Sequence, residues 1–378
     1  MINKDVEHTS IKILFAGGGT GGHLFPALAI ADEIRKMEPG AEIMFVGTKK
    51  KLEARVVPEH GYPFRTIWIS GFHRSARPTN LLFPLRVVVA LTQSLFLIRK
   101  FGPDVVVGTG GYVAGPVVYA ASLAGIATVV HESNSYPGVT TRLLSKRATR
   151  VLATFGATKK YLKRADNVEL VGNPTRNSLG RISREQGAEY FGLDPTKRTL
   201  LVFGGSLGAA SINGAMMEIV GDLLHEGLQI IWQTGERSLE NVQEVVDPIA
   251  RSTDGRKAMW IGKFIDHMEY AYAAADLIIC RAGATTLAEL TLLGKPAILV
   301  PYPHAAADHQ TVNAKTLASE GAAEILPDAE LGDGAKDVIL RLMNDDSARL
   351  KMGESSKRLG HPDAAQQIAR KILELAHR

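Results

Sequence analysis

The sequence predicts an α/β protein with two domains, each built on a parallel sheet. Short apolar runs of strand length alternate with stretches of helical periodicity along most of the 378 residues. A strand, a glycine-rich turn and a helix follow one another from Ile11, and the same order starts again at Thr199. Because strands that alternate with helices form parallel sheets with right-handed crossovers, we expect two Rossmann-like domains that face each other across a cleft.

Composition and turn signals place the domain boundaries. The turn-rich segment 171–177 indicates a linker, so we expect domains at 1–173 and 174–361, with a last helix in 362–378 that packs back on the first domain. The chain is 45% hydrophobic, which allows two large cores. The single cysteine, Cys280, excludes an intramolecular disulfide and fits a reducing compartment. The polar first ten residues do not resemble a secretory signal peptide.

The first strand, Ile11–Ala16, runs into glycines at positions 17, 18, 19, 21 and 22, and a helical pattern follows from Leu24 to Ile34. Backbone amides and the helix dipole favour an anion at such a turn. Glycine is needed there because a Cβ would block close approach of a ligand. His23 stands at the mouth of the turn, which is unusual for a site that only binds phosphate.

The same glycines match the dinucleotide pattern G-x-G-x-x-G at Gly17, Gly19 and Gly22. That pattern also requires an acidic residue at the end of the second strand, to bind a ribose diol. The second strand, Ala41–Val46, ends instead in Gly-Thr and three lysines. The sequence therefore argues against an NAD enzyme. The three lysines favour an NADP enzyme only slightly more.

The rest of the first half continues the alternation. His131 and Asn134 lie just past a buried strand, where ligands bind in open α/β sheets, although both could simply cap the loop. A second glycine turn occupies residues 109–115. The further strands are expected near 63–68, 104–108, 127–130, 150–154 and 168–171, and the helices near 78–100 and 116–124.

Charge is unevenly shared between the two halves. Residues 1–173 hold 22 basic and 12 acidic residues, a net charge of +10, and residues 174–378 have a net charge of −5. No nucleic-acid motif accompanies the basic half, so an anionic surface or an anionic substrate is the better explanation. Residues 60–103 contain no acidic residue, and their basic residues are Arg65, Arg74, Arg77, Arg86, Arg99 and Lys100.

The apolar run Leu81–Ile98 lies inside this stretch. Pro84, Arg86 and the polar residues 92–94 interrupt it, so it does not predict a transmembrane helix. It predicts a helix that either packs on the sheet or enters a lipid interface through Leu81, Leu82, Phe83, Leu95 and Phe96. The sequence leaves these two alternatives open.

The second half repeats the plan of the first. A strand at 199–203, a glycine turn at 204–208 and a helix at 209–225 come first, and strands near 228–232, 276–280 and 297–300 follow. The small residues Ala284, Thr285 and Thr286 open a helix after a strand and would present amides and hydroxyls to phosphate. Glu289, one turn further on, could accept hydrogen bonds from a ribose diol, or it could be a solvated helix residue. The polar segment 301–313 suits sugar hydroxyls.

These features favour a nucleotide-sugar glycosyltransferase. The second domain offers a phosphate turn and a diol carboxylate, and the first offers a glycine-lined turn with a histidine. No Asp-x-Asp pair occurs in the sequence, so a carboxylate-held metal is not indicated, and no cofactor is expected. Helix dipoles, amides and an arginine would then meet the diphosphate charge.

The sequence resembles the MurG family of two-domain, GT-B-type glycosyltransferases. The resemblance rests on six segments in order along the chain: GGTGGH at 18–23, GGYVAGP at 110–116, HESN at 131–134, GNPTR at 172–176, GGSLGA at 204–209 and AGATTLAE at 282–289. It implies an inverting transfer of N-acetylglucosamine from UDP-N-acetylglucosamine to lipid I, the undecaprenyl-diphosphate-linked muramoyl-pentapeptide. The β-1,4-linked product would be lipid II, a precursor in the peptidoglycan synthesis that underlies bacterial cell shape and division.

The resemblance also implies roles for single residues. Residues on the sugar and acceptor side would be Thr20, Gly21, Gly22 and Asn134, with Arg176 and Ser206 on the diphosphate and the backbone of Ile265 on the uracil. Phosphate and ribose would be held by Ala284, Thr285, Thr286, Leu287, Ala288 and Glu289, with Gln310 on the sugar hydroxyls. Leu207 and His309 depart from the family pattern, since both stand where relatives can carry glutamine.

His23 is the candidate general base, with a role as a hydrogen-bonding orienter as the alternative. A lipid-linked acceptor implies a peripheral enzyme at the cytoplasmic face of the bacterial membrane, with anionic lipid as a partner and other cell-wall synthesis proteins as possible partners. Other functions stay open: a UDP-N-acetylglucosamine 2-epimerase, a transferase with a soluble acceptor, and a non-enzymatic nucleotide-sugar binder. The acid-free stretch 60–103 argues against a soluble acceptor.

Overall fold

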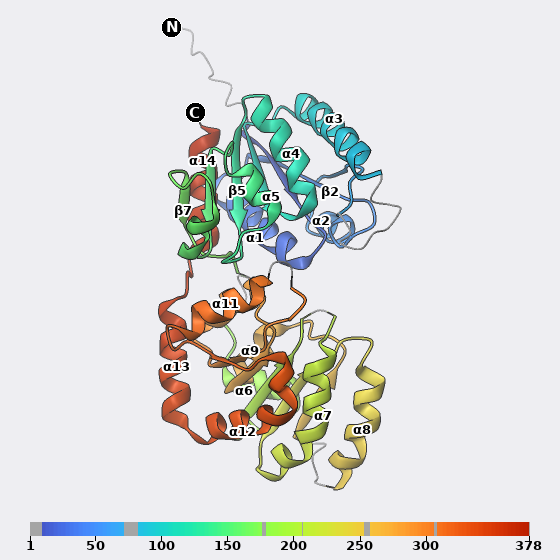
Figure 1. The fold of residues 1–378 in the computed structure, drawn as a ribbon, viewed down its shortest axis with the longest axis vertical. Helices are drawn as coiled ribbons and strands as arrows, with labels where there is room; N and C mark the ends of the chain where they lie inside the picture. Colours follow the sequence, from blue (N-terminus) through green and yellow to red (C-terminus); the bar gives the residue numbers. More distant parts are fainter. Residues whose placement is uncertain are drawn as a thin grey trace. The chain divides into compact units, whose positions relative to one another are not determined.

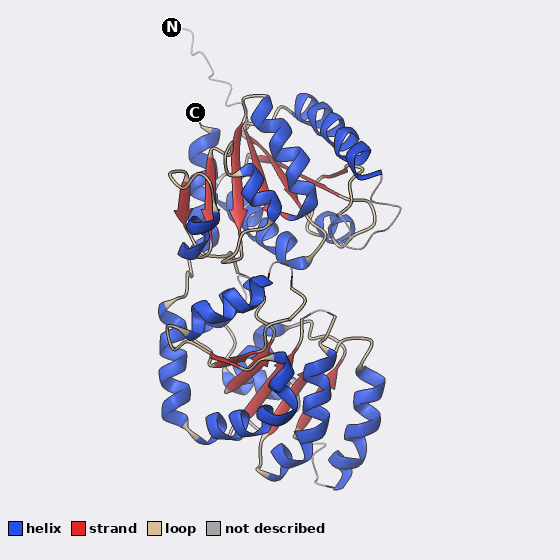
Figure 2. Ribbon diagram, viewed as in Figure 1, coloured by secondary structure: helices blue, strands red, loops and turns tan. Residues whose placement is uncertain are grey.

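The structure is a computed structural model that describes residues 10–71, 82–175, 179–205, 207–252, 258–305 and 308–377. The chain divides into two compact units, one formed by residues 1–175 with 362–378 and the other by residues 176–361 (Figure 1). These divisions fall beside the expected boundaries at 173/174 and 361/362. Each unit is an α/β layer structure in which helices cover a sheet (Figure 2).

Within its described residues, the first unit holds a seven-stranded parallel sheet in the order β3-β2-β1-β4-β5-β6-β7. Its strands are β1 (Lys12–Gly17), β2 (Glu42–Gly47), β3 (Phe64–Thr66), β4 (Val105–Gly110), β5 (Ala127–Glu132), β6 (Arg150–Ala153) and β7 (Val168–Leu170). The order reverses between β1 and β4, because the chain leaves β1 towards β2 and leaves β4 towards β5. In open α/β sheets such a reversal opens a crevice at the carboxyl ends of the two strands.

Both faces of this sheet are buried. Ile13 and Phe15 of β1 belong to one apolar cluster, whereas Leu14 and Ala16 belong to another, as the two-residue period of a strand requires. Each of these four side chains is fully buried, and full burial of a large apolar side chain contributes about 1.5–3 kcal/mol.

The helices of the unit are α1 (Gly21–Met37), α2 (Glu53–Glu59), α3 (Phe83–Phe101), α4 (Gly111–Leu123), α5 (Val139–Leu144), η2 (Gly156–Tyr161) and α14 (Ala364–Ala376).

The last helix packs on the first unit, as the sequence predicts. Ile368 and Ile372 of α14 are fully buried in the same cluster as Ile30 and Ile34 of α1. At its polar side, Lys371 pairs with Glu169 of β7. Figure 1 shows α14 (red) beside this sheet.

In the described part of the second unit, the parallel sheet has six strands in the order β10-β9-β8-β11-β12-β13. They are β8 (Thr199–Phe203), β9 (Gln229–Gln233), β10 (Met259–Gly262), β11 (Leu277–Cys280), β12 (Ala297–Leu299) and β13 (Glu324–Ile325). The sequence did not predict β10 or β13, both of which are edge strands. Here the order reverses between β8 and β11. The helices are α6 (Arg184–Tyr190), α7 (Ala210–His225), α8 (Leu239–Ser252), α9 (Met268–Ala274), α10 (Ala284–Leu293), α11 (His309–Ala318), η5 (Asp328–Glu330), α12 (Leu331–Asn344) and α13 (Asp346–Arg358).

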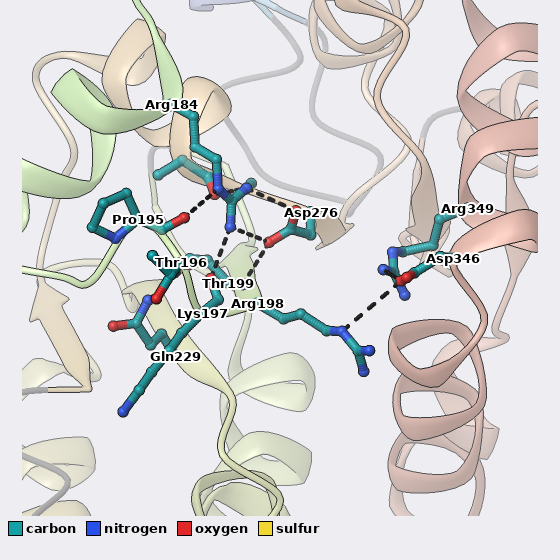
Figure 3. A network of polar contacts seen from close by, with 12 residues as sticks. Arg184, Pro195, Thr196, Lys197, Arg198, Thr199, Gln229, Asp276, Asp346 and Arg349 are labelled. Atoms are coloured by element: carbon teal, nitrogen blue, oxygen red, sulfur yellow. Dashed lines mark hydrogen bonds and ion pairs between the residues drawn. The ribbon is translucent and has the colours of Figure 1, made fainter.

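A polar network fixes the amino-terminal edge of the second sheet (Figure 3). The Arg184 guanidinium donates to both carboxylate oxygens of Asp276, at 2.7 and 2.8 Å, and to the carbonyl oxygens of Pro195 and Lys197. Asp276 also accepts from the amide of Thr199 at 2.8 Å. This two-pronged pairing is rigid, and it anchors α6 and the starts of β8 and β11 at the edge opposite to the carboxyl ends of the strands.

Candidate functional site

Two glycine turns meet at the strand reversal of the first unit. The turn after β1 contains Gly18 and Gly19, which have φ angles of +155° and +86°. A Cβ on Gly17 would lie 2.1 Å from the hydroxyl oxygen of Thr109, and a Cβ on Gly111 would lie 2.6 Å from the carbonyl oxygen of Gly18. Glycine is therefore required by the close packing of the two turns, in addition to any requirement from a ligand.

His23 joins the two turns. Its Nδ1 lies 3.1 Å from the carbonyl oxygen of Thr109, and the Thr109 hydroxyl donates back to the His23 carbonyl at 2.8 Å. A carbonyl can only accept, so Nδ1 carries the proton in the neutral ring and the lone pair is on Nε2. The ring packs on Gly110, where a Cβ would lie 2.5 Å from Nδ1. The geometry thus fixes the tautomer that a general base requires.

A buried carboxylate lies beneath the first turn. Glu53, which is 1% exposed, accepts from the amide of Gly19 at 3.0 Å and from the amide and hydroxyl of Thr48 at 3.1 and 2.7 Å. The Gly19 amide is therefore already bound to an anion that belongs to the protein. Glu53 was not expected from the sequence, because a carboxylate at the start of a short helix is ordinary.

The expected acceptor-side residues fall around this turn. Thr20 is the exposed, extended residue before α1, and Gly21 and Gly22 are the first residues of that helix. The first amides of a helix have no partner within the helix. Gly21 and Gly22 therefore bring helix-start amides to this turn.

His131, near the end of β5, and Asn134, in the loop that follows, lie at the same edge of the sheet. The carboxylate of Glu132 accepts from the backbone amide of Asn134 at 3.0 Å, from its side-chain amide at 3.2 Å, and from the amide of Gly138 at 3.0 Å. His131 is fully buried and its Nε2 donates to the carbonyl of Gly172 at 3.2 Å. Burial lowers the pKa of His131 to about 4, opposed by the Gly172 carbonyl and the Glu132 charge. His131 is therefore neutral at pH 7.

The second unit places its glycine turn at the other strand reversal, after β8. Gly205 and Gly208 have φ angles of +90° and +75°. A Cβ on Gly208 would lie 2.0 Å from the carbonyl oxygen of Thr234, so the turn lies directly on the end of β9. Leu207 is 85% exposed. The expected diphosphate residues Arg176 and Ser206 lie outside the described residues.

The start of α10, after β11, is the neighbouring segment of this edge. Gly283 is the extended residue before the helix, and the hydroxyl oxygen of Thr285 is buried with no hydrogen-bond partner in the described structure. Ala284 is buried, whereas Thr286 and Ala288 are partly exposed. Leu287 is 1% exposed and its amide donates to the Gly283 carbonyl at 3.0 Å, so it supports the turn from the core.

Glu289 is buried, with 5% exposure, and its Oε2 accepts from the hydroxyl of Tyr272 at 2.8 Å. The alternative that Glu289 is a solvated helix residue is therefore wrong. A carboxylate held in this way keeps a defined orientation, which recognition of a diol requires.

Two more expected contacts are constrained by neighbours. The amide of Ile265 donates to the side-chain oxygen of Gln233 at 2.9 Å, so the backbone group that Ile265 can offer to a base is its carbonyl. The side-chain oxygen of Gln310 accepts from the amide of Tyr302 at 2.9 Å, which directs its NH2 group away from that backbone.

The buried Arg281 is already bound by the protein. It donates to the carbonyl oxygens of Val300 and Pro301 at 3.2 and 3.1 Å and to the hydroxyl of Ser211 at 2.8 Å, and it pairs with Asp328. These partners make it a brace for the loop after β12. It is therefore a poor candidate for the arginine that meets a diphosphate.

Comparisons with known proteins agree with this arrangement. The glycosyltransferase family 28 N-terminal domain matches residues 13–153, and the family 28 C-terminal domain matches residues 199–368. A relative from Salinibacter ruber is 45% identical over 97% of this chain and 97% of its own length; it is named UDP-N-acetylglucosamine--N-acetylmuramyl-(pentapeptide) pyrophosphoryl-undecaprenol N-acetylglucosamine transferase.

Solved structures show the same fold. The crystal structure of Acinetobacter baumannii MurG matches with a TM-score of 0.75 and 29% identity, over 96% of this chain and 99% of that one. A UDP-N-acetylglucosamine 2-epimerase matches with a TM-score of 0.60 over 98% of each chain, but at 15% identity it shares the fold alone. The two family models and the long, 45% identical alignment show that this chain belongs to glycosyltransferase family 28.

Proposed function

We propose that this protein transfers N-acetylglucosamine from UDP-N-acetylglucosamine to lipid I, forming the β-1,4 linkage of lipid II with inversion at the anomeric carbon. The observation that carries this function is the 45% identity to a relative with that named activity across 97% of both chains. The two-domain GT-B fold is the matching scaffold. The 2-epimerase alternative rests on a likeness of fold at 15% identity and is not favoured.

The second unit is assigned to the donor. Its reversal point brings together the glycine turn after β8 and the start of α10, two backbone elements that suit a diphosphate. Buried Glu289, oriented by Tyr272, is suited to the ribose diol. The Ile265 carbonyl is suited to the N3–H of uracil, since its amide is already used. Arg176 and Ser206 remain proposed diphosphate ligands, on the basis of the resemblance to the MurG family.

The first unit is assigned to the acceptor and to the base. In the proposed step, the C4 hydroxyl oxygen of the muramoyl sugar attacks the anomeric carbon of the donor. The bond from that carbon to the UDP oxygen breaks, the electron pair leaves with UDP, and the hydroxyl proton passes to Nε2 of His23. The hydrogen bond from Nδ1 to Thr109 supports this role, because it fixes the accepting tautomer and stabilises the imidazolium that forms.

The membrane-contact alternative for helix α3 is favoured over a purely core helix. Only Ala90, Ser94 and Ile98 of α3 are buried, whereas Leu85, Val88 and Phe96 are 52%, 60% and 66% exposed. Their spacing of three and eight residues puts these exposed residues on one face of the helix. In the described ranges, no helix has the length and apolar character needed to cross a membrane.

We assign the exposed face of α3 to peripheral contact with the anionic, cytoplasmic leaflet where lipid I would be anchored. The basic residues Arg99 and Lys100 in its last turn add attraction to anionic lipid. Three residues of the expected surface, Arg74, Arg77 and Leu81, lie outside the described residues.

One assay separates the functions. UDP release from UDP-N-acetylglucosamine is measured with a polyprenyl-diphosphate-linked muramoyl-pentapeptide, with a soluble muramoyl-pentapeptide, and without acceptor. A lipid I transferase releases UDP only with the first acceptor or much faster with it. A transferase with a soluble acceptor releases UDP with the second acceptor. In the reaction without acceptor, an epimerase converts the donor into its C2 epimer with no net release of UDP, and a binder leaves the donor unchanged.

A further inference from the structure

A buried side chain bridges two loops at the carboxyl edge of the second sheet. Gln233 is the last residue of β9 and is 3% exposed. Its side-chain nitrogen donates to the carbonyl oxygen of Gly205 at 2.9 Å, and its side-chain oxygen accepts from the amide of Ile265 at 2.9 Å. Because β9 lies between β8 and β10 in the sheet, one side chain connects the loops that follow both neighbouring strands.

The two connected loops are assigned to different parts of the UDP-sugar donor in the proposed function. Gly205 belongs to the glycine turn assigned to the diphosphate, and Ile265 is the residue assigned to the base. The turn also lies against the backbone next to Gln233, since a Cβ on Gly235 would be 2.3 Å from the Leu207 carbonyl oxygen. The position of the turn relative to the Ile265 loop is therefore set through the end of β9.

Only a side chain that both donates and accepts can make this bridge. A glutamate of the same length could still accept from the Ile265 amide, but it would place a carboxylate against the Gly205 carbonyl without a proton to share. A methionine of similar length would make neither hydrogen bond and would leave a buried amide and a buried carbonyl unpaired.

We propose that Gln233 is a positioning residue for the donor, which fixes the spacing between the diphosphate turn and the base-reading carbonyl of Ile265. The bridge also makes the Ile265 loop selective, because the Ile265 amide is occupied and its carbonyl is the backbone group left to bind a base. Uracil has an N3–H to donate to that carbonyl, whereas N3 of cytosine has a lone pair. This inference rests on the proposed donor site and adds the residue that couples base recognition to diphosphate binding.

The same strand provides a matched control. Gln229, the first residue of β9, is 1% exposed and also makes a double backbone bridge. Its side chain donates to the Asp194 carbonyl at 2.7 Å and accepts from the Asp194 amide at 2.8 Å. It lies at the opposite end of the strand, beside the network of Figure 3. Gln229→Glu therefore removes a comparable hydrogen-bonded bridge from the fold and leaves the loops assigned to the donor unchanged.

The experiment titrates UDP and CDP into the wild type, Gln233→Glu, Gln233→Met and Gln229→Glu, well below each variant's melting temperature. We expect Gln233→Glu and Gln233→Met to weaken UDP binding about tenfold or more, the effect of losing about one hydrogen bond. We also expect both variants to lower the ratio of UDP affinity to CDP affinity. Gln229→Glu should lower the melting temperature while UDP affinity and the UDP/CDP ratio stay at the wild-type values.

Two results would overturn the inference. One is that folded Gln233 variants keep wild-type UDP affinity. The other is that Gln229→Glu loses UDP affinity as strongly as they do, which would make the effect one of stability. If Gln233→Glu does not fold, Gln233→Met decides by the same criteria. If the wild type itself binds no UDP, the proposed donor site fails, and this result is distinct from a failure of Gln233 alone.

Discussion

Lowering the pH from 7.5 to 5 should destabilise the first unit through His131. The ring is fully buried, and burial lowers its pKa from 6.5 to about 4. The folded state therefore holds a neutral ring at pH 5, whereas the unfolded chain takes up a proton below pH 6.5. Because the unfolded state binds more protons between pH 4 and 6.5, acid favours unfolding across this window.

The size of the effect follows from the two pKa values. The difference between 6.5 and about 4 corresponds to about 3 kcal/mol, which is lost in full below pH 4. At pH 5 the same relation gives about 2 kcal/mol, and at pH 7.5 the loss is close to zero. A loss of this size is a large part of the stability of an ordinary domain.

The assay compares the wild type with His131→Gln, whose side-chain amide can still donate to the Gly172 carbonyl. Hydrogen exchange of peptides from β5, followed against urea at pH 7.5 and pH 5, gives the free energy of unfolding of the first unit. The wild type should lose about 2 kcal/mol more than the variant between the two pH values. His60→Gln, at an exposed position of the same unit, should behave as the wild type. Equal losses in wild type and His131→Gln would refute the argument.

Three further predictions concern the donor site, the general base and the membrane surface. Glu289→Ala should weaken UDP binding by about 1.5–3 kcal/mol in a calorimetric titration, since a diol loses a charged acceptor; an unchanged affinity would remove Glu289 from the donor site. His23→Asn, which can still donate to the Thr109 carbonyl, should lower kcat about 10²-fold or more with donor affinity little changed, and a loss of only a few-fold would place the base elsewhere. Val88→Ser with Phe96→Ser should reduce the part of binding to anionic vesicles that survives high salt in a flotation assay, whereas unchanged flotation would move the membrane surface away from α3.

The sequence predicts most of the fold because the central strands are apolar on both faces. Val105, Val106 and Val107 of β4 are all fully buried, and such runs are recognisable without any structure. The strands that were missed, β10 and β13, are at the edges. β13 has two residues, and β10 has a burial pattern that is intermediate throughout. A short edge strand forms because it can hydrogen-bond to the backbone of a neighbouring strand, and that strand is distant in sequence.

The site shows the same division. Glycines, small residues and a histidine at strand ends are local signals, and they predict where a ligand site should lie. The partners that orient these residues come from other strands: Thr109 is 86 residues from His23, and Gln233 is 32 residues from Ile265. A glutamine at the end of a buried strand is a weak signal by itself. Only the sheet order shows that its two neighbours carry the loops it connects.

The two glycine turns look alike in sequence, but their supports give them different electrostatics. The amide of Gly19 in the first turn donates to the carboxylate of Glu53, whereas the carbonyl of Gly205 in the second turn accepts from the neutral amide of Gln233. A carboxylate close to a bound anion repels it, and this repulsion is stronger inside a protein than in water. The first turn therefore suits the neutral hydroxyls of a sugar better than a phosphate. The second turn has no such carboxylate among its described contacts, which agrees with the assignment of the UDP diphosphate to the second unit.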